Sequence, residues 1–418
     1  MLQKTSSLYG LPEKVTFCKK CVMSNQRPCS SIEFKTTKKQ LKKTMNLDEN
    51  GICDACNFNE QKKAINWKQR ESELLQLLDK HRSNNGDYDC IVSGSGGKDS
   101  VYTSHMLKYK YGMNPLTVTF PPILYTDYGY KNFRNWIEIG GFDNITLKPN
   151  GRVQKLLTKL SIENLLHPFQ TFILGQKNIA PKIAIKFGIP LIFYGENEAE
   201  YGNPIADNST SLRDKSFYTF NNINDVRLAG VTIKELIEKY DVKQGDLKTY
   251  LPADHNELTQ NKIDVRYFGY YAKWIPQEAY YYSVEHAGFQ ARPYRSEGTY
   301  SKYSSIDDKI DDLHYYTTYI KFGLGRASYD ASQEIRNNHI TREEGIALVN
   351  RFDGEIPQKY TQEVLDYLDI NVDHFFELCD KSRSPHLWEK KNGKWNLKHK
   401  VSNENIISSD NNSLGCSI

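Results

Sequence analysis

Long apolar runs, a leader and a strong charge are all missing from this sequence. No apolar stretch approaches the roughly 18 residues that span a bilayer, so no membrane segment is expected. The start, MLQKTSSLYGLPEKVTF, lacks the apolar core of a secretory signal, which predicts a cytoplasmic protein. The 55 Lys and Arg exceed the 51 Asp and Glu by only 4. Because nucleic-acid binders usually show a dense basic face, a nucleic-acid partner is not expected.

The overall composition is that of an ordinary soluble globular protein. Hydrophobic residues make up 39% and charged residues 25% of the 418 positions, which excludes wholesale disorder. A chain of this length can bury a substantial core without disulfides and predicts about two to three domains.

Five of the eight cysteines lie within the first 56 residues. They include two C-x-x-C pairs, Cys18 with Cys21 and Cys53 with Cys56. In a cytosolic protein such pairs indicate metal or redox sites rather than disulfides. Four thiolates suit the tetrahedral coordination of zinc, with no open position for catalysis. We predict a structural Zn²⁺ site, with two unrelated cysteine pairs as the alternative.

A lysine-rich stretch separates the two pairs. It is interpreted as a solvated loop, with contact to an anion as the less favoured alternative. Its lysines are Lys35, Lys38, Lys39, Lys42 and Lys43.

From residue 67 onward the pattern alternates between helix and strand. Leucines recur at helical spacing after Trp67, and the short apolar run CIV then leads into SGSGGKDS. Alternating strands and helices predict an α/β fold with a parallel sheet, whose ligand crevice lies at the carboxyl ends of the strands. Strands are predicted at residues 90–92, 115–120, 144–147 and 190–194, and helices between them at about 151–160 and 176–187.

The stretch SGGKDS, residues 95–100, carries the strongest chemical signal. Paired glycines let the backbone turn tightly, and the N-terminus of the following helix offers unpaired N–H donors to a phosphate. The stretch is not a Walker A motif, because Asp99 follows Lys98 where Ser or Thr would be required. A simple glycine-rich β–α turn is the alternative.

The stretch resembles the SGGxDS signature of the PP-loop ATP pyrophosphatases, which cleave ATP between the α and β phosphates. The resemblance implies ATP and Mg²⁺ as cofactors. A carboxylate in an anion cradle needs a reason, and two are considered for Asp99: it caps the helix, or it helps to hold Mg²⁺. The residues that would cradle the pyrophosphate are Ser95, Gly96, Gly97, Lys98, Asp99 and Ser100.

The positions of the cysteines indicate which nucleophile the enzyme uses. Thiolation uses a sulfur relay, usually cysteines near the ATP site, and the chain has no cysteine between Cys90 and Cys379. A buried thiol at Cys90 is more typical of packing than of catalysis. Ammonia is therefore the favoured nucleophile, and a tRNA-modifying enzyme of the thiolation or lysidine type is the alternative.

Longer stretches resemble the N-acetyl sugar amidotransferases over about residues 15–397. They include CKKCVMSNQRP, GICDACNF, IPLIFYGENEAEYGN, EGTYSKYSSIDDKIDDLHYYTTYIKFGLGRASYDASQEIRNNHITREEG and RSPHLWEKKNGKW. The family includes enzymes that act on pseudaminic and legionaminic acids and on diacetamido uronic acids of O-antigen. The resemblance implies that an acetamido group becomes acetamidino, at the expense of ATP, with release of AMP and pyrophosphate.

One segment departs from the family pattern. Residues 167–178, HPFQTFILGQKN, lack the cysteines of the corresponding segment in relatives, which leaves the sugar undefined. His167 is interpreted as a loop residue, with a ligand role as the less favoured alternative.

Further site residues are expected at the end of the fourth strand and in the Tyr- and Arg-rich region beyond residue 265. Glu196 is a catalytic candidate together with Lys98 and Asp99. Gly195 and Asn197 are expected to contact the nucleotide, and a polar loop at the end of the strand is the alternative for this group. Arg and Tyr suit an acidic sugar because they offer a planar fork and a stacking ring. The substrate candidates are Tyr201, Arg292, Arg295, Lys302, Lys321 and Arg326.

Two other polar groups are interpreted as structural. Asp307, Asp308, Asp311 and Asp312 resemble a metal cluster, but a solvated helix start is favoured. Thr341 and Glu344 are spaced as a capping box.

No glutaminase is visible in the chain. Neither Cys379 nor Cys416 lies in a nucleophile context, so ammonia is expected from separate subunits. The family resemblance implies a glutaminase with a cyclase-like partner. The expected organisation is a zinc module at 1–66, a PP-loop domain at 67–265, a mostly helical substrate or partner region at 266–400 and a flexible tail at 401–418.

Overall fold

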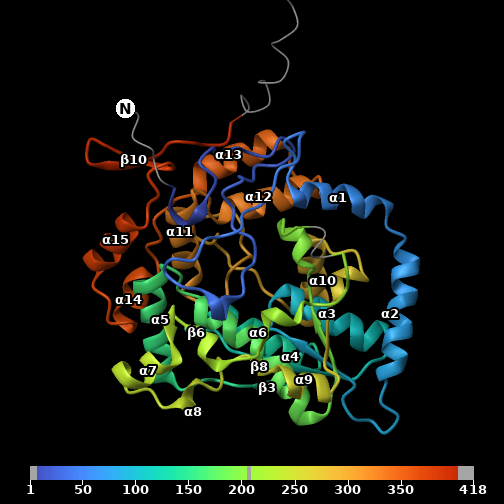
Figure 1. Ribbon diagram of the computed structural model, residues 1–418. Helices are drawn as coiled ribbons and strands as arrows, with labels where there is room; N and C mark the ends of the chain where they lie inside the picture. Colours follow the sequence, from blue (N-terminus) through green and yellow to red (C-terminus); the bar gives the residue numbers. More distant parts are fainter. Residues whose placement is uncertain (1–6, 205–208, 403–418) are drawn as a thin grey trace, which may run out of the picture.

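A five-stranded parallel sheet lies at the centre of the α/β part (Figure 1). The computed structural model describes residues 7–204 and 209–402. All neighbouring strands of the sheet run parallel, which confirms the predicted fold class. Their order is β3 (Asn144–Thr146), β2 (Pro115–Thr119), β1 (Cys90–Ser93), β4 (Leu191–Tyr194) and β9 (Asp264–Tyr267).

Alternate residues of β1 enter two different cores. Ile91 packs with apolar residues of β2 and α6, whereas Cys90 and Val92 pack with Leu74 and Leu78 of α2. Both faces of the strand are buried, which explains its continuous apolar run. The helices of this part are α2 (Trp67–His81), α3 (Lys98–His105) with its extension η3 (Met106–Lys110), α4 (Asp127–Glu138), α5 (Gly151–Leu165) and α6 (Gln170–Phe187).

The four predicted strands are present, but the fifth, β9, follows a long insertion after β4. The insertion is built of short elements. They are η4 (Glu198–Tyr201), η6 (Lys215–Phe217), β5 (Thr219–Phe220), η7 (Ile223–Asp225), β6 (Arg227–Leu228), β7 (Val231–Thr232), α7 (Ile233–Tyr240), α8 (Gln244–Leu247), β8 (Ala253–Asp254) and α9 (His255–Gln260).

The N-terminal segment lies against the C-terminal helices, and Figure 1 shows its blue trace beside α12 and α13. It contains η1 (Leu8–Gly10), η2 (Glu33–Lys35) and α1 (Asp54–Ala64). Its cysteines share an apolar cluster with Phe322 and Trp388. Arg342 donates hydrogen bonds to the backbone carbonyls of Cys18 and Cys21. The two ends of the chain therefore form one packed unit.

The C-terminal region is mostly helical, as predicted. The capping box of Thr341 and Glu344 is present at the start of α13. The elements are η8 (Phe268–Tyr270), α10 (Pro276–Ala287), α11 (Asp311–Phe322), α12 (Arg326–Arg336), α13 (Arg342–Phe352), α14 (Thr361–Tyr367), α15 (Val372–Lys381) and the hairpin of β10 (Trp388–Lys391) and β11 (Lys394–Leu397).

Packing crosses the boundary expected at residue 265. α10 lies against α3, and Ser283 donates to the carbonyl of Lys98 at 3.0 Å. Most of the expected tail, including Cys416, lies outside the described residues.

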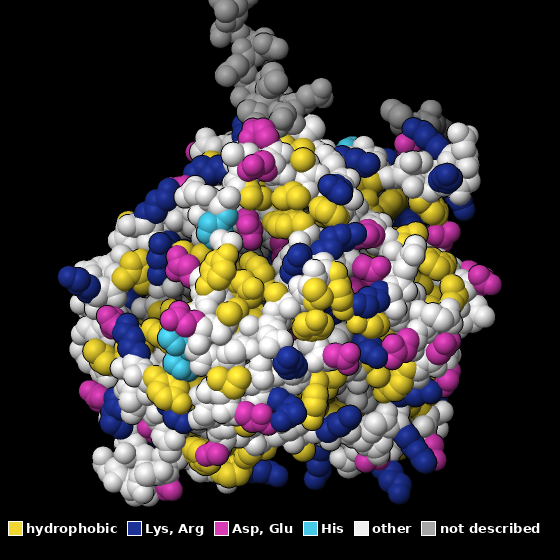
Figure 2. All heavy atoms as spheres, turned by 180° about the vertical axis from the view of Figure 1, so that it is seen from behind, with side chains coloured by type: hydrophobic (Ala, Val, Ile, Leu, Met, Phe, Trp, Pro, Cys, Tyr) yellow, Lys and Arg dark blue, Asp and Glu magenta, His cyan; other side chains and the backbone are white. Residues whose placement is uncertain are grey.

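The surface mixes charges of both signs. On the face shown in Figure 2, Lys and Arg side chains are interspersed with Asp and Glu. Within the two described ranges, no helix is long and apolar enough to cross a bilayer.

Candidate active site

The glycine loop joins β1 to α3 and is shaped by close backbone contacts. Gly96 has φ +84°, and a Cβ there would lie 2.6 Å from the Cα of Phe133. A side chain at Gly94 would collide with Ser100 at 2.1 Å. α3 begins without a side-chain cap at Gly97, which leaves its first N–H groups available to an anion.

The loop opens into a cavity of about 740 Å³. Walls come from residues 27–42, the end of β4, α6, residues 301–307, α11 and α12. The predicted residues that line it are Ser95, Gly96, Gly97, Lys98, Asp99, Ser100, Gly195, Glu196, Tyr201, Lys321 and Arg326.

Asp99 is held on both carboxylate oxygens. Lys98 Nζ lies 2.6 Å from Oδ2, and Trp274 Nε1 donates to Oδ1 at 3.0 Å. The side chain does not cap α3, so the first of the two roles considered for Asp99 is wrong. The carboxylate instead lies fixed at the cavity wall between a cation and an indole.

Glu196 lies close to Asp99 and shares its cavity wall. Its Oε1 accepts a hydrogen bond from the hydroxyl of Tyr201 at 2.7 Å. Burial raises the pKa of this carboxyl, and the nearby charge of Asp99 adds to the effect. A carboxyl in such surroundings holds a proton more readily than an exposed one.

Asn197 does not line the cavity. It is buried, and its side chain accepts from the backbone N–H of Ala199 at 3.0 Å, which caps η4. This contact is structural, in contrast to the predicted contact with the nucleotide.

Of the four aspartates before and at the start of α11, Asp308 and Asp312 are buried and Asp307 and Asp311 are half-buried, so their interpretation as a solvated helix start is wrong. Asp308 accepts backbone N–H groups of Ile123, Leu124 and Ile310. Burial raises the pKa of Asp308 to about 7. Asp307 lines the cavity and accepts from Ser95 Oγ at 2.8 Å, and Asp311 lines it as well.

Three of the predicted substrate residues lie away from the cavity. Arg295 forms a two-pronged ion pair with Glu355, at 2.6 Å from each nitrogen to its oxygen. Arg292 is buried and donates to the carbonyl of Ile306 at 3.1 Å, and Lys302 is exposed. Their predicted contact with the sugar is therefore not supported.

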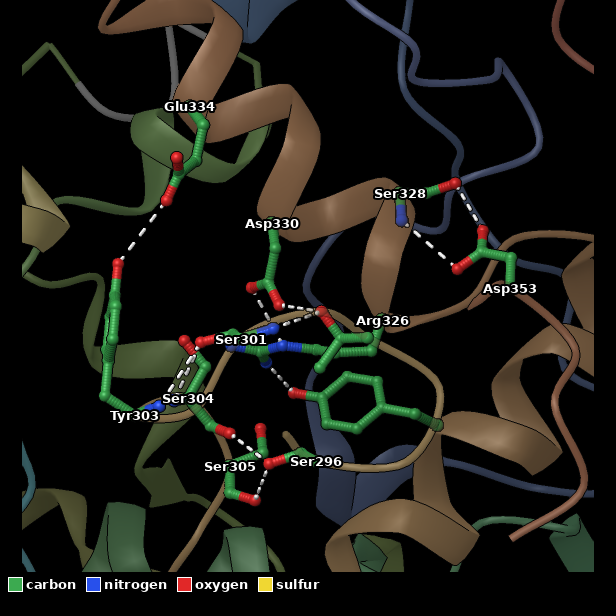
Figure 3. Close-up of polar contacts among 12 residues, drawn as sticks. Ser296, Ser301, Tyr303, Ser304, Ser305, Arg326, Ser328, Asp330, Glu334 and Asp353 are labelled. Carbon is green, nitrogen blue, oxygen red and sulfur yellow. Dashed lines mark hydrogen bonds and ion pairs between the residues drawn. The ribbon is translucent and has the colours of Figure 1, made fainter. Parts of the chain in front are cut away.

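Arg326 reaches the cavity from the start of α12 and is tied to its neighbours (Figure 3). Its Nε lies 3.0 Å from Asp330, and it also bonds the hydroxyl of Tyr315. Asp330 accepts from Thr299 at 2.6 Å. The loop of residues 296–305 is thereby fixed against α12.

Several cavity residues carry no recognisable sequence signal. Lys177, Arg213 and Cys29 line the cavity but belong to no motif. His167, interpreted as a loop residue, is buried in the wall, where its ring stacks on His314 with centroids 5.1 Å apart. Burial lowers the pKa of both histidines well below the usual value, so both rings are neutral.

The four cysteines of the two C-x-x-C pairs form one buried cluster. Their sulfur atoms all lie within 4.8 Å of one another. The Sγ atoms of Cys18 and Cys56 are 3.8 Å apart, and those of Cys21 and Cys53 are 3.7 Å apart. Tetrahedral Zn–S bonds of about 2.3 Å require sulfur spacings of about 3.8 Å, so the cluster fits a single zinc ion.

A comparison with protein families identifies the end of the chain. Residues 297–402 match the family described as LPS biosynthesis protein WbpG-like, C-terminal domain. Because of this similarity, we call residues 297–402 the WbpG-like domain. It supplies Arg326, Lys321 and Asp307 to the cavity wall.

The chain is also similar to one curated protein, the uncharacterized protein MJ1599 of Methanocaldococcus jannaschii. The two are 36% identical over 77 residues, which are 18% of this chain and 27% of that protein. The match thus spans about a quarter of the relative.

Two solved structures share a limited likeness. NMN synthetase from Francisella tularensis is 16% identical with a TM-score of 0.24, over 55% of this chain and 89% of that chain. The U34-tRNA thiolase NcsA from Methanococcus maripaludis, with its [4Fe-4S] cluster, is 11% identical with a TM-score of 0.27, over 70% and 83%. Because both TM-scores are low, the fold assignment rests on this chain's own sheet order and glycine loop.

Proposed function

We propose that the protein is an ATP-dependent amidotransferase that converts an acetamido group of a bacterial N-acetyl sugar to acetamidino. The observation that carries this proposal is the SGGKDS loop opening into a cavity that residues of the WbpG-like domain also line. The expected sugars are nonulosonic acids or diacetamido uronic acids, free or linked to a nucleotide. The family's description as lipopolysaccharide biosynthesis proteins supports this class of substrate.

Two steps account for the reaction. The acetamido oxygen attacks the α-phosphorus of ATP, the bond to the β-phosphate breaks and pyrophosphate leaves. Ammonia then adds to the imidate carbon, and AMP leaves with the former amide oxygen. Activation is needed because an amide carbon is a poor electrophile, and adenylylation turns its oxygen into a good leaving group.

The loop and its neighbours are assigned to the first step. The free N–H groups at the start of α3 and the ammonium of Lys98 oppose the phosphate charge. Asp307 and Asp311 offer oxygens suited to Mg²⁺, which would neutralise phosphate charge when bound. Asp99 is less suited to a metal, because Lys98 and Trp274 already occupy its oxygens.

Glu196 is assigned to the second step. Its raised pKa makes it able to accept a proton from the attacking ammonia. Ammonia itself is proposed to come from a separate glutaminase with a cyclase-like partner. Among the described residues, Cys90 and Cys379 are buried in the apolar cores, away from the cavity.

One observation favours a second candidate, a PP-loop enzyme that modifies tRNA. Cys29 places a thiol in the cavity wall, where a sulfur-transfer enzyme would need one. Replacing Cys29 with Ser separates the two functions, because amidotransfer requires no thiol at this position.

The experiment is a substrate panel with the purified chain, Mg-ATP and ammonium. The proposal predicts AMP and pyrophosphate together with a sugar whose acetamido oxygen is replaced by NH, and no turnover with glutamine alone. ATP cleavage that requires tRNA, and that Cys29→Ser abolishes, would establish the second candidate instead.

A further inference from the structure

Charged side chains of both signs line the cavity, and one group of basic side chains lacks a close carboxylate partner. Asp99, Glu196, Asp307 and Asp311 lie by the glycine loop and the start of α11. Four cations from four separate segments also line the wall, and we call them the cationic wall. They are Lys42, Lys177 on α6, Arg213 and Lys321 on α11.

Electrostatic contacts connect the members of the cationic wall. Burial and the neighbouring charges of Arg213 and Lys42 lower the pKa of Lys177, and burial and the charge of Lys42 lower the pKa of Lys321. The carboxylates acting on these lysines are Glu33 and Glu198. Four basic side chains of the wall therefore have only two carboxylates near them.

The two carboxylates are already engaged elsewhere. Glu198 accepts from the hydroxyl of Tyr267 and the amide of Asn203, both at 3.0 Å, and lies 4.0 Å from Arg213. Glu33 accepts from Ser31 at 3.2 Å. Neither carboxylate forms a close two-pronged pair with a cation of the wall.

Among these basic side chains, Arg213 most clearly lacks hydrogen-bond partners. Its side chain is only 5% exposed, and both Nε and Nη1 lack a hydrogen-bond partner. Lys321, also buried, donates to the backbone carbonyl of Leu165 at 3.1 Å. A buried guanidinium with free N–H groups is costly unless an anion completes it.

We propose that Lys42, Lys177, Arg213 and Lys321 form a second anion-binding subsite, which holds a carboxylate or phosphate group of the acceptor sugar. This inference rests on the proposed function for the identity of the sugar. The planar fork of Arg213 matches either oxyanion, and the three ammonium groups add charge. ATP binds at the glycine loop, so the cationic wall orients the acceptor independently of the nucleotide.

Calorimetric binding with two probes tests the subsite. N-acetylneuraminic acid carries a carboxylate, and UDP-N-acetylglucosamine carries a diphosphate. We expect Lys177→Gln and Arg213→Gln to raise the Kd of one probe at least tenfold and to leave the Kd of ATP within twofold. Lys186→Gln, at an exposed position on the same helix, should change neither. The probe that loses affinity identifies the anion.

The outcomes separate this inference from the proposed function. Unchanged affinity for both probes in the folded Lys177→Gln variant would overturn the subsite, as would failure of both probes to bind the parent protein at millimolar concentration. Absence of AMP formation with every acetamido sugar would contradict the proposed function. It would not change the Kd values by which the subsite is tested.

Proton uptake on binding is a second measurement. It would not occur if Lys321 had a purely structural role. Burial and the charge of Lys42 lower the pKa of Lys321 to about 7. The other titratable groups around it are Glu33 and the neutral His167 and His314. A bound anion favours the ammonium, so binding at pH 8 should take up a proton, measured by calorimetry in two buffers of different ionisation enthalpy. Lys321→Met should lose this uptake, and equal uptake in both proteins would contradict the assignment.

Discussion

At the scale of single residues, the site depends on side chains that are held by specific partners. Asp99 is fixed by Lys98 and Trp274, and Glu196 is fixed by Tyr201. These contacts set the position of the two carboxylates, and burial raises the pKa of Glu196. Substitutions that keep shape but remove charge therefore test their roles without creating cavities.

We expect Asp99→Asn to lower the rate of ATP-dependent AMP formation by about 100-fold or more, because the substitution frees Lys98 and removes a charge from the cavity wall. The rate is measured by pyrophosphate release. Asp127→Asn serves as the control, since Asp127 lies exposed in the first turn of α4. Equal rates in the two variants would remove Asp99 from the catalytic set.

Asp308 predicts a pH dependence of stability. Its folded pKa of about 7 lies above its ordinary value of 3.8, so between these values the folded chain binds a proton that the unfolded chain has lost. The unfolding free energy contributed by this group is therefore full below pH 4 and declines as the pH rises to 7, by about 1 kcal/mol per pH unit.

Thermal midpoints from pH 5 to 8 test this dependence. The midpoint of the parent should fall more steeply with rising pH than that of Asp308→Asn, whereas Asp87→Asn, at an exposed position, should follow the parent. Parallel curves for the parent and Asp308→Asn would show that Asp308 is ionised in the fold.

At the scale of elements, helix α1 connects the cysteine cluster to the glycine loop. It begins directly after Cys53, and Lys62 in its last turn lies 2.6 Å from Glu200 and donates to the carbonyl of Trp274 at 3.2 Å. Trp274 in turn donates to Asp99. Through α1 the cluster is thereby connected to the residues that hold Asp99.

Lys62→Met should lower both the thermal midpoint and the rate of ATP cleavage, because it leaves Glu200 buried without its cation. Breaking such a pair costs about 3–5 kcal/mol. Lys63→Met is the matched control, since its side chain is 65% exposed. A Lys62→Met protein with the parent's midpoint and rate would argue against this connection.

The glycine loop offers a pair of neighbouring positions with opposite expectations. Gly96→Ala should lower the thermal midpoint, because its Cβ would collide with the backbone of Phe133 and φ is positive. Gly97→Ala should be tolerated, as its nearest contact would be Ser95 Oγ at 3.9 Å. Differential scanning fluorimetry distinguishes the two, and equal midpoints would show that the loop is not as tightly packed as described.

Elements with a local signal were predictable, and elements formed by distant packing were not. β1, its loop and α3 follow from an apolar run, paired glycines and helical spacing in adjacent residues. β9 was missed because DVRY has little apolar character and follows the long insertion after β4. The pairs of cysteines were recognisable from spacing, whereas Lys177 and Arg213 join the cavity only through tertiary contacts.

At the scale of the whole molecule, the cavity is formed where the N-terminal segment and the C-terminal helices meet the α/β part. Residues 27–42 and the WbpG-like domain close the space above the glycine loop. The sequence placed acidic-sugar residues at Arg292 and Arg295, but these side chains stabilise the C-terminal region. The four side chains of the cationic wall therefore come from segments that no single motif connects.

The most direct test of the account follows the oxygen of the acetamido group. The purified protein is incubated with Mg-ATP, ammonium and an acetamido sugar whose amide oxygen is ¹⁸O, and the products are analysed by mass spectrometry. Adenylylation of the amide predicts one ¹⁸O atom in AMP, none in pyrophosphate, and an unlabelled acetamidino sugar. Recovery of ¹⁸O in the sugar, with AMP unlabelled, would contradict the account.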